Sequence, residues 1–435
     1  MEKQSCLKEF VRYSSLNVLG MTGLSCYILA DTFFVSKGLG ANGLAALNLA
    51  IPVYSFIHGT GMMLGMGGAT KYSIFKGQKA FRNSNLIFTN TGYLAAVFAA
   101  VFMVIGIFFS KNVTLLLGAD TEVFAMTNTY LKIILLFAPA FIMNDILICF
   151  VRNDGNPRLS MNAMLGGSML NIILDYVFIF PFDMGIFGAV LATGLSPVIS
   201  MIILSGHFLK RKNNFCFEKV APHAAMIGYT LSLGFPSLVT EVSSGVVIIV
   251  FNMIILNIQG NIGIAAYGVI ANLSLVVIAV YTGIAQGMQP LISRAYGQND
   301  KSTVRQVRRY ALSALFMVSC VICLTVFLLA SPIAGIFNSE GSVRLQDIAV
   351  YGLRLYFIAA PFVGYNIVLL TFFTSTEKAV WAHLLSLLRG LILIIPMAFL
   401  LSSLAGITGV WLAFPVTECL VAVLGIILKI KTQTD

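Results

Sequence analysis

Charged side chains are scarce in this sequence. Only 10% of its 435 residues are Asp, Glu, Lys or Arg, whereas 58% are hydrophobic, and the mean hydropathy is +0.91. Soluble globular domains carry about 25% charged residues. So few charges exclude a two-domain cytosolic enzyme, and they also exclude nucleic-acid binding as the explanation of the net charge of +10.

Motifs for catalysis and metal binding are also missing. The four histidines are far apart in sequence, and the chain has no nucleophile elbow, phosphate-binding loop or H-E-x-x-H motif. Its seven cysteines are scattered, mostly within apolar runs, and imply no disulfide framework. We therefore expect no enzyme, no cofactor and no metal site.

Hydrophobic segments fill nearly the whole chain. A helix that crosses the hydrocarbon core of a bilayer takes about 20 apolar residues, and charge runs and Gly/Pro clusters separate twelve such segments. We expect an all-α integral membrane protein with spans at 11–36, 43–70, 84–109, 124–151, 158–181, 185–209, 223–257, 262–293, 304–330, 346–374, 379–402 and 406–429.

The two halves of the sequence repeat each other. Residues 39–46 align with 259–266 at an offset of 220, and 185–188 align with 406–409 at an offset of 221. Each repeat holds six spans, so both have the same orientation and a pseudo-twofold axis should run along the membrane normal. We expect two pseudo-symmetric six-helix bundles with a central cavity between them, at 1–206 and 224–435, joined by a linker at 207–223.

Basic residues are distributed unevenly between the two sides of the predicted membrane. The side of the termini and the even-numbered connections holds 21 Lys and Arg, against Lys37, Lys111 and Arg344 on the other side. Cytoplasmic loops carry such an excess, so we expect a plasma-membrane protein with both termini and the linker in the cytoplasm. Contact with anionic lipid head groups accounts for the remaining basic charge.

Six ionisable residues lie well inside predicted spans, where such groups are costly and are functional candidates. They are Asp31, Asp145, Asp175, Glu241, Arg389 and Glu418. Asn171 and Asp175 are four residues apart and share a helix face, where an amide and a carboxylate could hold a small cation or a proton. For Asp145, near Arg152, a structural ion pair and a functional role are both open.

Arg389 needs a partner, because its guanidinium cannot lose its proton and is too costly to bury alone. The acidic residues at comparable depth in its own half are Glu241 and Glu418. We expect a structural ion pair with Glu418, on the neighbouring span. Glu241, if unpaired, then becomes a secondary candidate for ion coupling.

Four stretches of the sequence jointly resemble a known family. They are Asp31-Thr32-Phe33-Phe34-Val35, the R-N-D-G-N-P run at 152–157, L-N-I-I-L-D at 170–175 and G-I-F-G-A at 185–189. They are similar to the multidrug and toxic compound extrusion (MATE) family, in particular its prokaryotic MepA-like and DinF-like branch. The resemblance implies a MATE/MOP-type transporter with a cation-coupling site formed by Asp31, Asn171, Asp175 and Thr193, and with Glu241 in the secondary role.

The function implied is secondary active multidrug efflux, in which amphiphilic, often cationic compounds are exchanged for H⁺ or Na⁺ by alternating access. A lipid-linked oligosaccharide flippase of the same superfamily is an alternative, and an integral-membrane enzyme is a weaker one. Expected partners are small amphiphilic cations and membrane lipids, with the chain working as a monomer. Aromatic and methionine side chains suit such substrates, and the cavity candidates are Tyr27, Tyr54, Met62, Met63, Met66, Tyr281 and Met288.

Overall fold

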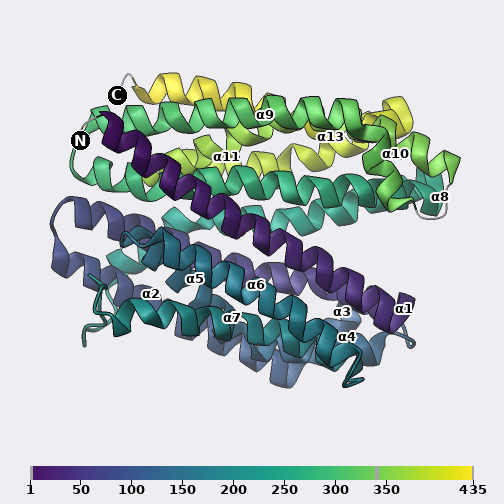
Figure 1. Cartoon of the computed structure of the whole chain (residues 1–435), viewed down its shortest axis with the longest axis horizontal. Coiled ribbons are helices and arrows are strands. Elements are labelled where there is room, and N and C mark those ends of the chain that lie inside the picture. Colours follow the sequence, from purple (N-terminus) through teal and green to yellow (C-terminus); the bar gives the residue numbers. More distant parts are fainter. Residues whose placement is uncertain (1–2, 339–341, 434–435) are drawn as a thin grey trace.

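The computed structural model describes residues 3–338 and 342–433, and all regular structure in these residues is helical (Figure 1). The α-helices are α1 (Lys3–Gly77), α2 (Phe81–Val104), α3 (Ser110–Leu116), α4 (Phe124–Leu136), α5 (Ala138–Asn153), α6 (Pro157–Ile179), α7 (Gly185–Leu209), α8 (Ala224–Gly297), α9 (Lys301–Phe337), α10 (Val343–Tyr356), α11 (Ala360–Ser375), α12 (Ala379–Leu387) and α13 (Ile394–Gln433). Short π-helical turns follow α2 and α12, and a 3₁₀ turn joins α10 to α11.

Glycines reverse the chain inside three of the longest helices. Gly40 in α1 (φ 66°, ψ −156°), Gly260 in α8 (φ 65°, ψ −157°) and Gly406 in α13 (φ 57°, ψ −134°) adopt backbone angles that favour glycine. The reversal in α1 is evident from Tyr27 and Tyr54, which flank Gly40 at similar sequence distances and whose hydroxyls lie 2.9 Å apart. Each of these helices is therefore a hairpin of two spans.

The span count follows from these hairpins. Eight helical segments are long and apolar enough to cross a membrane, and α4 with α5, bent by 49°, makes a ninth. Three of the eight contain a glycine reversal and count twice. The described residues thus hold twelve spans, and the predicted fold class is confirmed.

The backbone repeats at the offsets predicted from the sequence. Gly185 (φ 58°) lies 221 residues before Gly406 (φ 57°), and Lys79 (φ 60°) lies 220 residues before Asn299 (φ 57°). These are uncommon conformations, above all for residues other than glycine. Their recurrence shows that the halves share one chain path.

Buried apolar side chains form two cores. One is built mainly by α1–α7, here called the N bundle, and the other mainly by α8–α13, here called the C bundle. The C-bundle core also contains Cys6, Phe10 and Tyr13 from the start of α1. Figure 1 shows the reason: α1, in purple, begins beside the C bundle and crosses diagonally to the N bundle. The sequence limits predicted for the two bundles and the linker stay a prediction.

Close contact between α1 and α8 depends on glycine. A Cβ at Gly67 would collide with the carbonyl oxygen of Thr230, and one at Gly283 would collide with the backbone of Val18. Small residues let membrane helices approach until their backbones touch. The interface between the bundles is therefore tightly packed along these two helices.

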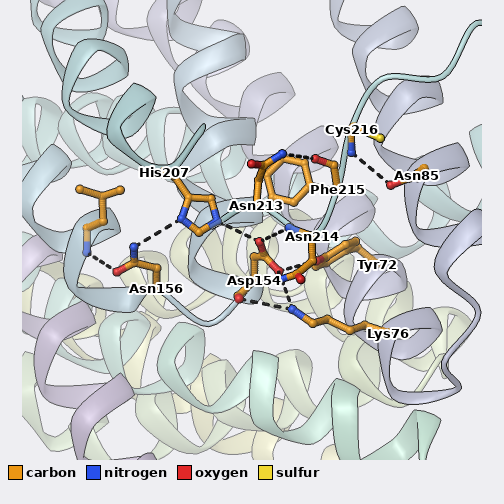
Figure 2. Close-up of polar contacts among 11 residues, drawn as sticks. Tyr72, Lys76, Asn85, Asp154, Asn156, His207, Asn213, Asn214, Phe215 and Cys216 are labelled. Carbon is orange, nitrogen blue, oxygen red and sulfur yellow. Dashed lines mark hydrogen bonds and ion pairs between the residues drawn. The ribbon is translucent and has the colours of Figure 1, made fainter. Parts of the chain in front are cut away.

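The segment between α7 and α8 is fastened to the N bundle at one carboxylate (Figure 2). The Asp154 side chain is fully buried and accepts hydrogen bonds from Tyr72 Oη (2.6 Å) and from the backbone N–H of Asn214 (2.8 Å). It also pairs with Lys76 Nζ (2.5 Å) and His207 Nε2 (2.8 Å). One buried anion thus holds together α1, α5, α7 and the following segment.

This environment controls the titration of Asp154. Burial by itself favours the protonated acid, but the bonds from His207, Lys76, Tyr72 and the Asn214 backbone outweigh it and hold the pKa of Asp154 well below its usual range. A carboxyl whose pKa is depressed on folding stabilises the fold above its unfolded value of about 3.9. That stabilisation is lost as the pH falls through the folded-state pKa.

Asp154→Asn should therefore lower the melting temperature of the detergent-solubilised protein at neutral pH. Removing one partner of a buried ion pair costs about 3 kcal/mol, and here Lys76 loses its anion. The difference from wild type should shrink as the pH is lowered below about 4, because the unfolded chain then binds a proton at this carboxyl while the folded protein keeps its carboxylate. Asp183→Asn, at an exposed loop position with φ 49°, is the matched control and should melt like wild type. Equal melting of all three proteins at neutral pH would contradict this role for Asp154.

Candidate functional site

Two carboxyl groups meet inside the N bundle. Asp31 lies in the first span of α1 and Asp175 in α6; both side chains are buried, and they share a side-chain hydrogen bond. A hydrogen bond between two carboxyl groups requires a proton on one of them. The pair can therefore hold one proton at a position shielded from water.

The other two predicted coupling residues are buried in the same bundle. Asn171 lies one helical turn before Asp175 on α6 and is fully buried, and Thr193 on α7 is 4% exposed. Tyr130 of α4, which was not predicted, hydrogen-bonds Thr193 and lies near both Asp31 and Asp175. Four elements thus contribute carboxyl, amide and hydroxyl oxygens to one region.

A cavity of about 70 Å³ lies between the bundles, with walls from α1, α5, α6, α7 and α8. Tyr27, Tyr54 and Met62, three of the predicted substrate contacts, line it. No lysine or arginine is among its lining residues in the described part of the chain. Its ionisable lining groups include two acids, Asp145 and Glu241, and one histidine, His58.

The other four residues expected at the cavity lie elsewhere in this structure. Met63 is buried where α1 crosses α8, and the sulfur of Met66 lies 3.2 Å from Arg152 Nη2. Tyr281 is buried in the C bundle, and its hydroxyl lies 2.8 Å from Ser319 Oγ. Met288 is fully buried in the same core. These four side chains pack between helices and do not line the cavity.

Asp145 pairs with a histidine and not with Arg152. Its Oδ2 lies 3.0 Å from His58 Nδ1, and the His58 ring stacks on Tyr54 at a centroid distance of 5.9 Å and an interplanar angle of 4°. Glu241, from α8 of the C bundle, lines the same cavity. In the sequence, His58 is notable only as an ionisable side chain within an apolar span. Its partner could not be predicted, because Asp145 belongs to a distant span.

Arg152 instead joins the two bundles. Its fully buried guanidinium donates to Asn17 Oδ1 (3.0 Å) and to Gln286 Oε1 of α8 (2.7 Å). Nearby, Asn153 donates to Gln289 (3.0 Å). An ion pair between Lys71 and Glu377 adds a further link across the interface. These contacts, here called the interbundle lock, lie at the end of the molecule where α5 ends and the chain passes from α7 to α8.

Arg389 and Glu418 form an ion pair inside the C bundle. Arg389 Nε lies 2.6 Å from Glu418 Oε1, and Asn366 Nδ2 donates to Glu418 Oε2 at 2.7 Å. Neither partner lines the central cavity. Glu418 is thus neutralised by a cation that keeps its proton at any physiological pH.

Replacing Arg389 alone by Leu should destabilise the protein by about 3 kcal/mol, because Glu418 loses the charge that neutralises it. The double variant Arg389→Leu with Glu418→Leu should recover most of that loss, since the pair is replaced by apolar side chains. Melting temperatures in detergent measure both effects. If the double variant were as unstable as the sum of the two single variants, Arg389 and Glu418 would not act as a pair.

Solved structures share this fold over nearly the whole chain. A MATE transporter of the MOP superfamily in an outward-facing conformation superposes with a TM-score of 0.90 at 24% identity, covering 97% of this chain and 95% of that one. A mutant of the Vibrio cholerae MATE transporter VcmN gives 0.92 at 20% identity, covering 100% and 98%. A MOP superfamily transporter from Pyrococcus furiosus gives 0.90 at 23% identity, covering 97% and 95%. This chain thus shares the two-bundle fold of these solved structures.

The family follows from the sequence. A model of the MatE family matches residues 18–177 and 236–400, which make up most of the chain, so this protein belongs to the MatE family. The multidrug export protein MepA of Staphylococcus saprophyticus is 26% identical over 99% of this chain and 96% of its own length. MepA of Staphylococcus aureus strain MRSA252 is 26% identical over 97% and 93%. The chain is therefore a multi-pass membrane transporter and not an enzyme, as predicted.

Proposed function

We propose that this protein exports amphiphilic cations from the cell by antiport with H⁺ or Na⁺ through alternating access. Its relatives along nearly the full length are named for multidrug export. The observation that carries the coupling proposal is the hydrogen-bonded pair of Asp31 and Asp175, buried in the N bundle. No cofactor takes part in this mechanism.

Ion coupling in this proposal follows from binding linkage. A cation or proton at the carboxyl pair removes net negative charge from the N bundle and thereby favours a different packing of its helices. A substrate that prefers the opposite packing is then exchanged for the ion, even if the two never touch. The oxygens of Asn171 and Thr193 beside the carboxylates suit Na⁺, whereas the two carboxyls alone suit a proton.

The central cavity is the proposed substrate route. Drug-sized ligands occupy pockets of about 300–1,000 Å³, so a cavity of about 70 Å³ must widen before it admits one. The interbundle lock closes one end of the interface, and breaking its contacts would let the bundles separate there. Alternating access then consists of the bundles separating at this end of the interface and closing at the other.

The charge of the cavity separates this proposal from a flippase of the same superfamily. A lipid-linked oligosaccharide carries anionic phosphate, which lysine and arginine would bind. The lining includes the acids Asp145 and Glu241 with the single imidazole of His58. A cationic substrate fits that set of groups better.

Asp31→Asn should abolish efflux while the protein still folds and binds substrate, because the amide keeps the shape but cannot exchange a proton. Ethidium accumulation in a drug-sensitive host measures transport, with and without Na⁺ to identify the coupling ion. Ethidium binding to purified protein should persist. Asp347→Asn, at an exposed position on α10, is the matched control and should transport normally. Full efflux by Asp31→Asn would refute the coupling site.

We further propose that the chain lies in the plasma membrane as a monomer surrounded by lipid, with both termini in the cytoplasm. The N and C termini lie at the same end of the molecule (Figure 1), and the basic residues concentrate on that side. Fusing a reporter that is active only in the cytoplasm to either terminus should give activity. A reporter active only outside the cytoplasm should be silent at both ends. Activity of that reporter would show that the termini lie outside and would contradict the proposed orientation.

A further inference from the structure

His58 is held in the cavity in a way that resembles a bound ligand. One face of its ring stacks on Tyr54, with an interplanar angle of 4°, and its Nδ1 lies 3.0 Å from Asp145 Oδ2. Gly61, three residues further along α1, makes room for this carboxylate, because a Cβ there would collide with Asp145 Oδ2. A flat ring on an aromatic face, paired to a carboxylate, is the arrangement that a planar aromatic cation would adopt.

Other polar atoms of the cavity have no partner. Ser168 Oγ and Ser200 Oγ are buried, line the cavity and form no hydrogen bond, and the same holds for Asn144 Oδ1. Asp145 Oδ2 also lacks a hydrogen bond with good geometry and has His58 as its counter-ion. Buried polar groups are costly when unsatisfied, so these atoms indicate a site that is completed by a ligand or by water.

We infer that the imidazolium of His58 occupies the site of the substrate's cationic group, and that a planar aromatic monocation displaces it from Asp145 and from the face of Tyr54. This inference rests on the proposed export of amphiphilic cations and names the residues that select them. Asp145 binds the positive charge, Tyr54 binds the ring, and the unsatisfied hydroxyls and amide satisfy the polar edge of the ligand. His58 is thus a tethered competitor of the substrate.

The charge balance follows from this exchange. The imidazolium that leaves Asp145 loses its carboxylate partner and gives one proton to water, while one monovalent cation enters. The net charge of the cavity stays the same. Substrate binding therefore releases one proton, and low pH opposes binding by keeping His58 in the site.

Few other ionisable groups face His58. They are Asp145 and Cys149 from α5, Glu241 from α8, Tyr54 on its own helix and Tyr27 on the first span of α1. The linings from α6 and α7 hold no charged side chain in the described residues. Asp31 and Asp175 are not among the lining residues, so their protonation can be separated from that of His58 by mutation.

The test is ethidium binding to the purified full-length protein, measured by fluorescence between about pH 5.5 and 8.5. For wild type, affinity should fall by about tenfold per pH unit in the acidic limb, the slope of one proton exchanged for one cation. His58→Gln should bind ethidium with an affinity that is at least as high, and its slope with pH should be smaller by the one proton that His58 contributes. Asp145→Asn should bind at least tenfold more weakly at all pH values.

Matched controls separate this effect from other titrations. His383→Gln removes an imidazole whose Nε2 lies 2.6 Å from the carbonyl oxygen of Ser232, outside the cavity lining, and should keep the wild-type slope. Asp31→Asn removes the proton of the coupling site, so the slope that persists in this variant belongs to His58. An unchanged slope in His58→Gln would overturn the inference.

A second measurement needs no variant. Adding saturating ethidium to wild-type protein in weak buffer, at a pH where His58 is protonated, should release about one proton per bound dye. No proton release would overturn the inference even if His58→Gln failed to fold. If ethidium binds and is exported while both tests fail, the inference is wrong and the proposed function stands. If wild type neither binds nor exports it, both are wrong.

Discussion

A charge buried in a membrane protein must be neutralised or solvated by polar groups where it lies, and most of the polar architecture here follows from that constraint. Arg389 is neutralised by Glu418, His58 faces Asp145, and Asp31 shares a hydrogen bond with Asp175. The first of these pairs contains a guanidinium, which never loses its proton. It is therefore a fixed structural element, whereas the other two can change charge by gaining or losing a proton. The capacity to switch lies in the N bundle and on the cavity wall.

Arg152 satisfies the same constraint without a carboxylate. It donates to the amide oxygens of Asn17 and Gln286 and touches the sulfurs of Met66 and Cys149. Two of these partners, Asn17 and Met66, belong to α1, and Gln286 belongs to the C bundle. The requirement to solvate one buried guanidinium thus binds the bundles together at the interbundle lock. Because amides hold a cation less strongly than a carboxylate does, such a lock can open.

Local rules predicted much of this structure from the sequence. Apolar runs of spanning length located the helices, and the 220-residue repeat paired Gly40 with Gly260 before their matching backbone angles were known. Arg389 was assigned Glu418 because a guanidinium in lipid leaves few alternatives. The partner of Asp145 could not be predicted in this way. His58 lies 87 residues earlier in sequence, and the glycine at position 61 that admits the carboxylate acts through the packing of α1 on α5.

The same limit applies to the cavity. Tyr130 joins the carboxyl region through Thr193, and nothing in the sequence of α4 indicates that this tyrosine faces the carboxyl groups. Met63 follows Met62 directly and so faces a different side of the helix, whereas Met66 lies one turn beyond Met62 and contacts Arg152 instead of the cavity. Which face of a membrane helix meets a cavity depends on its neighbours, because lipid and protein interior are equally apolar.

The repeat finally explains why the switching groups are confined to one half. At an offset of 220, Asp31 corresponds to Phe251, and at an offset of 221, Thr193 corresponds to Phe414. Phe251 is buried in the C-bundle core, and Phe414 stacks on Tyr356 at a centroid distance of 4.5 Å. The two halves therefore share a backbone path but differ in chemistry, with apolar packing in one where the other has oxygens. In the proposed mechanism, a change of charge in the N bundle therefore acts against a C bundle that is held by aromatic contacts and a fixed ion pair.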